Sequence, residues 1–173
     1  AFELLLDSTL ERIQLEKDQL LEARYADANI LPILSACMMN ASFSTLADHD
    51  ELYRQYPLAQ VYRGQVFPSL GVQAARLLLN QDLYLSDIEG RLTARLGEAV
   101  LPVSQNGFMS RLNFYHLADY HIVSLAALAT GELTPADFAG KTVILGVTEA
   151  GVSDIRSTPL GQIPGPLFHY TFI

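Results

Sequence analysis

The polar residues best placed to do chemistry follow an apolar run near the C-terminal end of the sequence. The run 142–147 (Thr-Val-Ile-Leu-Gly-Val) is rich in β-branched residues and lies between Gly140 and Gly151. A short run of this kind predicts a strand that is buried on both faces. The segment 148–166 that follows is full of Gly, Ser, Thr and Pro. Long irregular connections often carry function, and open α/β sheets bind ligands at the carboxyl ends of their strands.

This segment has two interpretations that the residues leave open. Its polar groups could line a pocket for a small polar ligand, or its glycines and prolines could simply shape a loop. Asp154 could contact a ligand, cap a turn or pair with Arg156. If the segment binds a ligand, the expected contacts are the backbone of Gly151 and the side chains of Thr148, Ser153, Asp154 and Thr158.

The histidines give a weaker indication of chemistry. His116 and His121 flank Asp119, which could form a metal cluster if the loop folds back. Their spacing matches no standard zinc pattern and there are no cysteine partners, so exposed loop histidines are favoured and no metal is predicted. His169 follows Phe168 in an apolar stretch. That setting favours a hydrogen-bonded structural residue over a proton switch.

Several common catalytic motifs can be excluded. The triplet 140–142 (Gly-Lys-Thr) resembles the end of a phosphate-binding loop, but position 135 is proline where that loop needs glycine. The triplet also precedes a predicted strand, whereas a phosphate-binding loop must open a helix. The sequence contains neither a dinucleotide-binding glycine pattern nor a Gly-x-Ser-x-Gly nucleophile motif. We therefore predict no catalytic residues and no cofactor.

Composition limits the partners and the compartment. The chain has 173 residues and a net charge of −8, which is one-domain size and makes nucleic acid an unsuitable partner. Cys37 is the one cysteine, so no internal disulfide can form, and its apolar neighbours predict a small core residue. There is no secretory signal pattern and no apolar run long enough to span a membrane. Both ends look cut within longer elements.

Local patterns predict two helices and one strand in the N-terminal half. The segment 8–11 (Ser-Thr-Leu-Glu) fits a capping box ahead of a helix whose apolar stripe includes Leu10 and Leu20. The run 30–39 predicts a buried strand with a proline near its start. Pro68 opens the clearest helix. Its expected buried face comprises Leu70, Ala74, Leu77 and Leu78.

The middle of the sequence predicts an antiparallel meander. Strands are expected at 91–96, 99–103 and 109–115, with an Asn-Gly turn at 106–107. A helix is expected to begin after Ser124 and to end at Gly131. Because strand and helix patterns alternate at both ends with hairpins between them, the predicted fold class is α/β, with a layered mixed sheet flanked by helices.

The C-terminal stretch 138–173 also resembles a known family. It is similar to the C-terminal signature of the second type of CHASE domain (cyclases/histidine kinases associated sensory extracellular). That family also places a histidine where His169 stands, which adds His169 to the candidate ligand site. The residues that carry the resemblance are Gly140, Lys141, 143–145, 146–148, Gly151, Asp154, Thr158, Pro159, Pro164, Gly165 and His169.

The resemblance implies a function and a location. It implies one α/β sensory domain over 1–173, truncated at both ends, in a bacterial membrane signalling protein such as a histidine kinase, a nucleotide cyclase or a diguanylate cyclase. The domain would lie on the periplasmic or extracellular side of the inner membrane. Its partners would be an unknown small molecule or physical stimulus, the membrane-spanning helices of its own chain, and a second copy. Two alternatives remain: a small soluble α/β enzyme acting on a polar metabolite, and a ligand-free dimerisation module.

Overall fold

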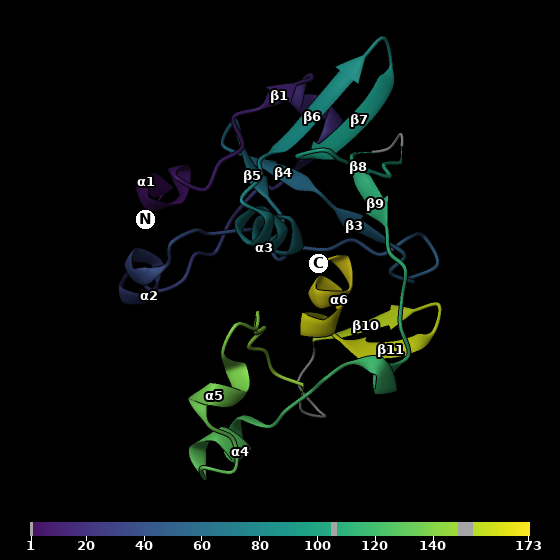
Figure 1. Ribbon diagram of the computed structural model, residues 1–173. Coiled ribbons are helices and arrows are strands. Elements are labelled where there is room, and N and C mark those ends of the chain that lie inside the picture. Colours follow the sequence, from purple (N-terminus) through teal and green to yellow (C-terminus); the bar gives the residue numbers. More distant parts are fainter. Residues whose placement is uncertain (1, 105–106, 149–153) are drawn as a thin grey trace.

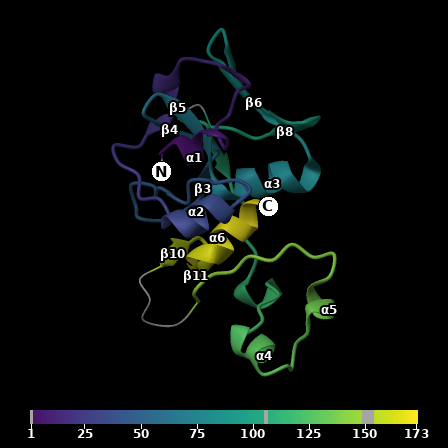
Figure 2. The same cartoon turned by 90° about the vertical axis from the view of Figure 1, so that its left-hand side faces the viewer.

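Short helices joined by extended chain surround small sheets in the computed structural model (Figures 1 and 2). The structure describes residues 2–104, 107–148 and 154–173. Its described helices are α1 (Phe2–Leu6), η1 (Lys17–Gln19), α2 (Leu31–Ala36), α3 (Leu70–Leu79), η2 (Leu117–Asp119), α4 (Leu125–Ala129), α5 (Pro135–Phe138) and α6 (Gly165–Phe172), where η marks a 3₁₀ turn.

The strands combine parallel and antiparallel pairs. The described strands are β1 (Ile13–Gln14), β2 (Leu21–Glu22), β3 (Gln55–Pro57), β4 (Ala59–Tyr62), β5 (Gln65–Pro68), β6 (Leu83–Ile88), β7 (Arg91–Leu96), β8 (Ala99–Leu101), β9 (Met109–Arg111), β10 (Ile155–Thr158) and β11 (Gly161–Pro164). One sheet has the order β1-β6-β7-β8 and another the order β2-β4-β5. Pairs β1–β6 and β2–β4 are parallel. The predicted class, α/β with mixed sheets and antiparallel hairpins, is confirmed.

The middle hairpins form largely where the sequence predicts them. β7 pairs with β8 around Gly97, whose φ of 59° lies in the left-handed region. β9 does not pair with β8, because it lies against β3 instead. The backbone N–H of Ser104 still donates to the carbonyl of Met109 at 2.7 Å. The first residue of the predicted Asn-Gly turn lies outside the described residues.

The predicted helix after Pro68 is confirmed as α3, but a different face is buried. Val72 and Ala75 are buried, whereas Leu77 and Leu78 are exposed. The helix has apolar residues on more than one side, so its neighbours decide which side faces the core. One neighbour is α6, which reaches α3 so closely that a Cβ atom on Gly71 would lie 2.7 Å from Phe172.

The predicted N-terminal helix is wrong. The segment that was expected to continue helically from Leu10 instead contributes β1, η1 and β2. Leu10 and Leu20 are nevertheless buried, as the apolar pattern requires. Parallel pairing with β6 and β4, far away in the sequence, overrides the local helical period.

The predicted strand at 30–39 is also wrong, because α2 forms there. Pro32 occupies the first turn of α2, a position as suitable for proline as a strand start. Leu34 is buried, but Ile33 is exposed and so is Cys37, which is therefore not the core residue that we expected. Short apolar runs do not distinguish a strand from a helix by period alone.

The largest difference concerns the run 142–147. It forms no strand and is mostly exposed, with Leu145 79% accessible. Together with α4 and α5, it extends away from the main sheets in both ribbon views (Figures 1 and 2). A strand buried on both faces needs neighbouring strands, and no described strand pairs with this run.

Two clusters of buried side chains hold the rest together. The larger one lies between the β1-β6-β7-β8 and β2-β4-β5 sheets and α3, and includes Leu58, Leu85 and Phe108. The second surrounds α6 and is aromatic: Tyr56, Tyr120 and Phe168 are buried in it. Phe172 packs against both clusters, so α6 connects them.

Candidate functional site

Much of the predicted ligand segment 148–166 is not irregular, because it forms a hairpin that leads directly into a helix. β10 and β11 pair from Ile155–Pro164 to Thr158–Gly161, and α6 begins at Gly165. Three of the predicted site residues belong to this unit or adjoin it: Asp154 at its start, Thr158 at the hairpin turn and His169 in α6. Thr148 is exposed and lies in the extended segment before it. The other two predicted contacts, Gly151 and Ser153, lie outside the described residues.

Asp154 forms an ion pair with Arg156, which was one of the interpretations left open. The carboxylate lies 2.8 Å from the Arg156 guanidinium. The backbone carbonyl of Asp154 accepts a hydrogen bond from Gly165 N–H at 2.9 Å. The carboxylate also covers the Cα of Gly165, since a Cβ there would lie 2.2 Å from Asp154 Oδ2. A negative charge at this point is favourable for the N-terminus of α6.

Arg156 connects the hairpin to a loop that precedes it by about a hundred residues. Its Nε donates to Thr45 Oγ1 at 3.2 Å, and its guanidinium lies 5.3 Å from the centre of the Tyr53 ring. The backbone N–H of Tyr53 donates to Ser157 C=O at 2.8 Å. Sequence reasoning missed Thr45 and Tyr53, because nothing local shows that they meet the hairpin.

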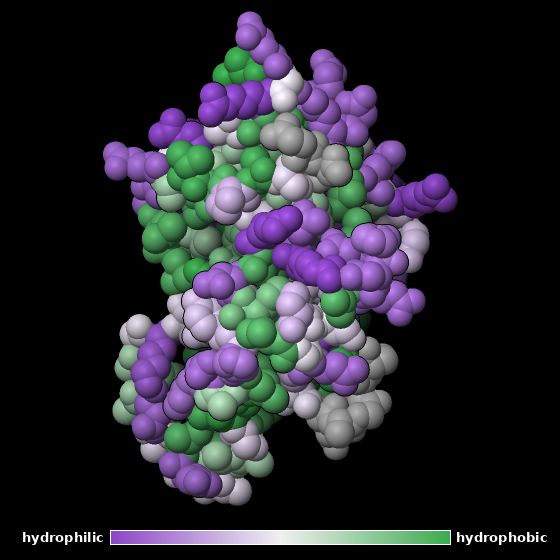
Figure 3. Space-filling view, turned by 90° about the vertical axis from the view of Figure 1, so that its right-hand side faces the viewer, coloured by the Kyte–Doolittle hydropathy of each residue, from purple (hydrophilic) through white to green (hydrophobic). Residues whose placement is uncertain are grey.

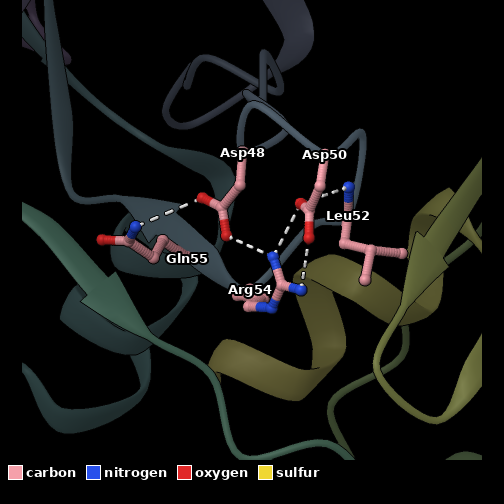
Figure 4. A network of polar contacts seen from close by, with 5 residues as sticks. All are labelled: Asp48, Asp50, Leu52, Arg54 and Gln55. Atoms are coloured by element: carbon pink, nitrogen blue, oxygen red, sulfur yellow. Dashed lines mark hydrogen bonds and ion pairs between the residues drawn. The ribbon is translucent and has the colours of Figure 1, made fainter.

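The loop that carries these contacts has an ion-pair network of its own (Figure 4). The Arg54 guanidinium donates to Asp50 at 2.7 and 2.8 Å and to Asp48 at 2.9 Å. These bonds hold the pKa of the Asp50 carboxyl well below its usual range. The loop also closes through Asp48 N–H, which donates to Leu52 C=O at 2.8 Å. The network therefore fixes the chain just before Tyr53.

Thr158 has a structural role in the hairpin turn. Its side chain is buried. The hydroxyl donates to Gly161 C=O at 2.7 Å and accepts from Leu160 N–H at 3.3 Å. Because its hydrogen is already donated within the turn, Thr158 shapes the site rather than offering a free donor to a ligand.

His169 is a buried, hydrogen-bonded residue, which confirms the structural interpretation of its apolar setting. Its Nδ1 lies 2.6 Å from the Tyr56 hydroxyl, which also accepts from Gly71 N–H at 2.8 Å. Burial, and secondarily the charge of Arg156, lower the pKa of His169 to about 4, although the Asp154 charge opposes this. Burial likewise raises the pKa of Tyr56 to about 12. Both side chains are neutral at pH 7 and share this one hydrogen bond.

This arrangement combines a neutral, hydrogen-bonded histidine with an ion pair that solvent reaches. His169 is neutral and its Nδ1 is occupied by Tyr56. The Asp154–Arg156 pair is the part that solvent reaches, with side chains 45% and 19% accessible. A polar or charged molecule could compete for either partner. Within the described ranges, no group of three or more His, Cys, Asp and Glu side chains could hold a metal ion.

Comparison with known proteins identifies the family. The model of the CHASE2 domain matches residues 1–173. Neither the curated proteins nor the solved structures contain a match to this chain. None of the described helices is long and apolar enough to cross a membrane. The family match covers the hairpin, the aromatic cluster and α6 together, and the chain therefore belongs to the CHASE2 family of sensory extracellular domains of signalling proteins.

Proposed function

We propose that this chain is the extracytoplasmic input domain of a bacterial membrane protein whose output is a histidine kinase, a nucleotide cyclase or a diguanylate cyclase. The observation that carries the proposal is the CHASE2 match over residues 1–173. The domain itself has no catalytic role in this proposal. Its own membrane-spanning helices would link it, on the periplasmic side of the inner membrane, to the output enzyme. The net charge of −8 supports a domain held away from anionic lipid and without nucleic acid as a partner.

The proposed input is the segment 148–165, and the proposed transmitter is α6. Asp154 contacts both Arg156 and Gly165, the first residue of α6. A change in the ion pair would therefore alter the contacts at the start of this helix. At its other end, α6 contacts α3 through Phe172 and Gly71. A stimulus can shift this arrangement only by its differential affinity for two states. A ligand that captured Arg156 or Asp154 would supply such a difference.

The input is tested in the full-length protein in membranes, by its output activity. Asp154→Asn keeps side-chain size and Arg156→Gln keeps a polar side chain, although a shorter one. Each removes one charge, and we expect both to change the output. Asp82→Asn is the matched control, because Asp82 pairs with Arg76 at 3.0 Å without involving the hairpin or α6. An output that is the same in both hairpin variants as in the wild type would show that this segment is not the input.

The location can be tested with Cys37, the one cysteine of this chain, which is exposed. A membrane-impermeant maleimide added to intact cells is expected to label the full-length protein. Cys37→Ser is expected to abolish this labelling, which controls for cysteines elsewhere in the protein. Labelling only after the inner membrane has been broken would contradict a periplasmic location.

A homodimer is proposed as the active form, supported by the apolar run 142–147. Val143 and Leu145 are exposed, and the backbone of the run makes no hydrogen bond to other described residues. An exposed apolar segment whose backbone groups are unpaired can pair as a strand with another copy. The face shown in Figure 3 also carries apolar side chains at the level of α4 and α5. We expect Leu145→Glu to reduce dimerisation in analytical ultracentrifugation, and Leu160→Glu, at another exposed leucine, to leave it unchanged.

A further inference from the structure

A pocket lined by three tyrosines lies beside α6. Its volume is about 490 Å³, within the usual range for small-ligand sites. Tyr115 and Tyr120 come from η2 and its approach, and Tyr170 comes from α6. Thr142 and Ile144, from the extended run before the candidate site, form another wall. The pocket therefore joins α6 to that run.

The three rings are arranged as adjoining walls. Tyr115 and Tyr120 have ring centres 6.2 Å apart and an angle of 90° between their planes. Tyr120 and Tyr170 have ring centres 5.7 Å apart and an angle of 67°. Tyr120 is buried and fixed by a hydrogen bond of 2.6 Å between its hydroxyl and Thr171 Oγ1. Tyr115 and Tyr170 are about half exposed, so the box formed by the three tyrosine rings opens to solvent.

The charge at the pocket is negative. Asp119 is among the lining residues, and one of its carboxylate oxygens accepts from His116 N–H at 3.1 Å. The described lining includes no lysine, arginine or histidine. Electron-rich ring faces attract cations, and a box of such rings is suited to an alkylated ammonium group that is poorly hydrated. An anion would meet the Asp119 carboxylate with no compensating positive group.

We propose that this pocket binds a quaternary or otherwise alkylated ammonium compound. The ammonium group would lie among Tyr115, Tyr120 and Tyr170, and Asp119 would neutralise its charge. The hydroxyl of Thr142 would be available to a polar tail. The surrounding charge supports a cation, because the chain carries a net charge of −8.

The proposal deepens the proposed sensory function and rests on it for the consequence of binding. Tyr170 and Thr171 belong to the last turn of α6, next to His169 in the sequence. Thr171 Oγ1 also donates to Leu167 C=O at 2.8 Å within the helix. A ligand in the box would thus contact the same helix that the Asp154–Arg156 pair contacts at its start.

Isothermal titration calorimetry of the 173-residue chain with choline chloride tests the pocket without any signalling output. The control ligand is 3,3-dimethylbutan-1-ol, which has the shape of choline but no charge. We expect choline to bind and the neutral compound to bind at least about ten-fold more weakly, as loss of the cation–π attraction requires. Equal binding of the two compounds, or no heat from choline at about 10 mM, a concentration that detects millimolar affinity, would overturn the proposal.

Variants of the exposed tyrosines separate the rings from general damage to the fold. Tyr170→Leu and Tyr115→Leu are each expected to weaken choline binding about ten-fold, whereas Tyr170→Phe retains the ring and should change it less than about three-fold. Tyr25→Leu, at an exposed tyrosine that does not line the pocket, controls for tyrosine loss. Unchanged affinity in Tyr170→Leu and Tyr115→Leu would contradict the assignment. If choline fails to bind while Asp154→Asn still alters the output of the full-length protein, the ammonium site is wrong and the sensory function stands.

Discussion

The phenol of Tyr56 and the imidazole of His169 share a hydrogen bond of 2.6 Å in the interior of the protein, although 113 residues separate them. Tyr56 belongs to β3 and His169 to α6. Because the same phenol oxygen accepts from Gly71 N–H, α3 is held at this point as well. Three elements therefore meet at one oxygen atom, and we expect the stability of α6 to depend on it.

Burial of neutral His169 predicts a loss of stability in mild acid. The pKa of His169 is about 4 in the folded protein, whereas an unperturbed histidine has a pKa of 6.5. As pH falls, the unfolded chain therefore takes up a proton first. The contribution of His169 is complete above pH 6.5 and is lost progressively between 6.5 and 4. From pH 7 to pH 5, this residue should lower the free energy of unfolding by about 2 kcal/mol.

Urea unfolding at the two pH values measures this loss. His169→Gln cannot take up the proton, so the difference between pH 7 and pH 5 should shrink by about the same amount. His121→Gln changes an exposed histidine and is expected to leave the difference as in the wild type. An equal pH dependence in wild type and His169→Gln would mean that His169 is not buried in its neutral form.

Removal of one hydroxyl should be costly at Tyr56. Tyr56→Phe leaves both Gly71 N–H and His169 Nδ1 without their partner in a buried place. Unsatisfied buried groups of this kind cost about 1–3 kcal/mol each, and we expect the variant to lose about 2 kcal/mol or more in chemical denaturation. Tyr62→Phe is the matched control, because the Tyr62 hydroxyl has no hydrogen-bond partner among the described residues. Equal stability of the two variants would refute the role of Tyr56.

Gly165 and Asp154 should be energetically coupled. In Gly165→Ala the new methyl group must displace the Asp154 carboxylate, which breaks the 2.8 Å pair with Arg156. In an Asp154→Ala background there is no carboxylate to displace, and alanine should stabilise α6 by up to about 1 kcal/mol through its helix propensity. A double-mutant cycle is expected to give a coupling of about 1 kcal/mol. Gly165→Ala combined with Asp50→Ala should be additive, and additivity in the first cycle would contradict the contact.

A single turn offers a stabilising substitution. Glu89 and Gly90 join β6 to β7 with φ values of 54° and 80°, both in the left-handed region. Asparagine adopts this conformation more readily than glutamate, and Asn-Gly is the preferred pair for such a two-residue turn. Glu89→Asn should therefore raise the free energy of unfolding by about 0.5 kcal/mol. The control is Glu98→Asn at the Gly97 turn. Glu98 has no positive φ, so this change should not raise the free energy of unfolding.

Local patterns were sufficient where a short stretch of chain contains all the interactions. Ser124 caps α4, as predicted, by accepting from Ala126 N–H at 3.2 Å. The hairpin of β7 and β8 forms around Gly97 as predicted. The family resemblance was likewise contained in the order of residues within one segment. Each of these features depends on groups a few residues apart.

The partners of apolar segments could not be predicted in this way. The sequence indicates that 142–147 is suited to burial, but not which strand would pair with it, and in the structure it lies exposed. The same limitation affected two other segments. Pairing with distant strands decided the structure of β1 and β2, and a proline in the first helical turn suited α2.

For the site, the sequence alone determined the family, the candidate residues Asp154 and His169, and the apolar setting that keeps His169 from acting as a switch near pH 7. Only the tertiary structure decided what those residues contact. Tyr56, Thr45 and Tyr53 reach the hairpin and α6 from about a hundred residues away. The physical reason is that burial is a preference of each residue, which composition records, whereas contact depends on how distant elements pack, which no local pattern contains.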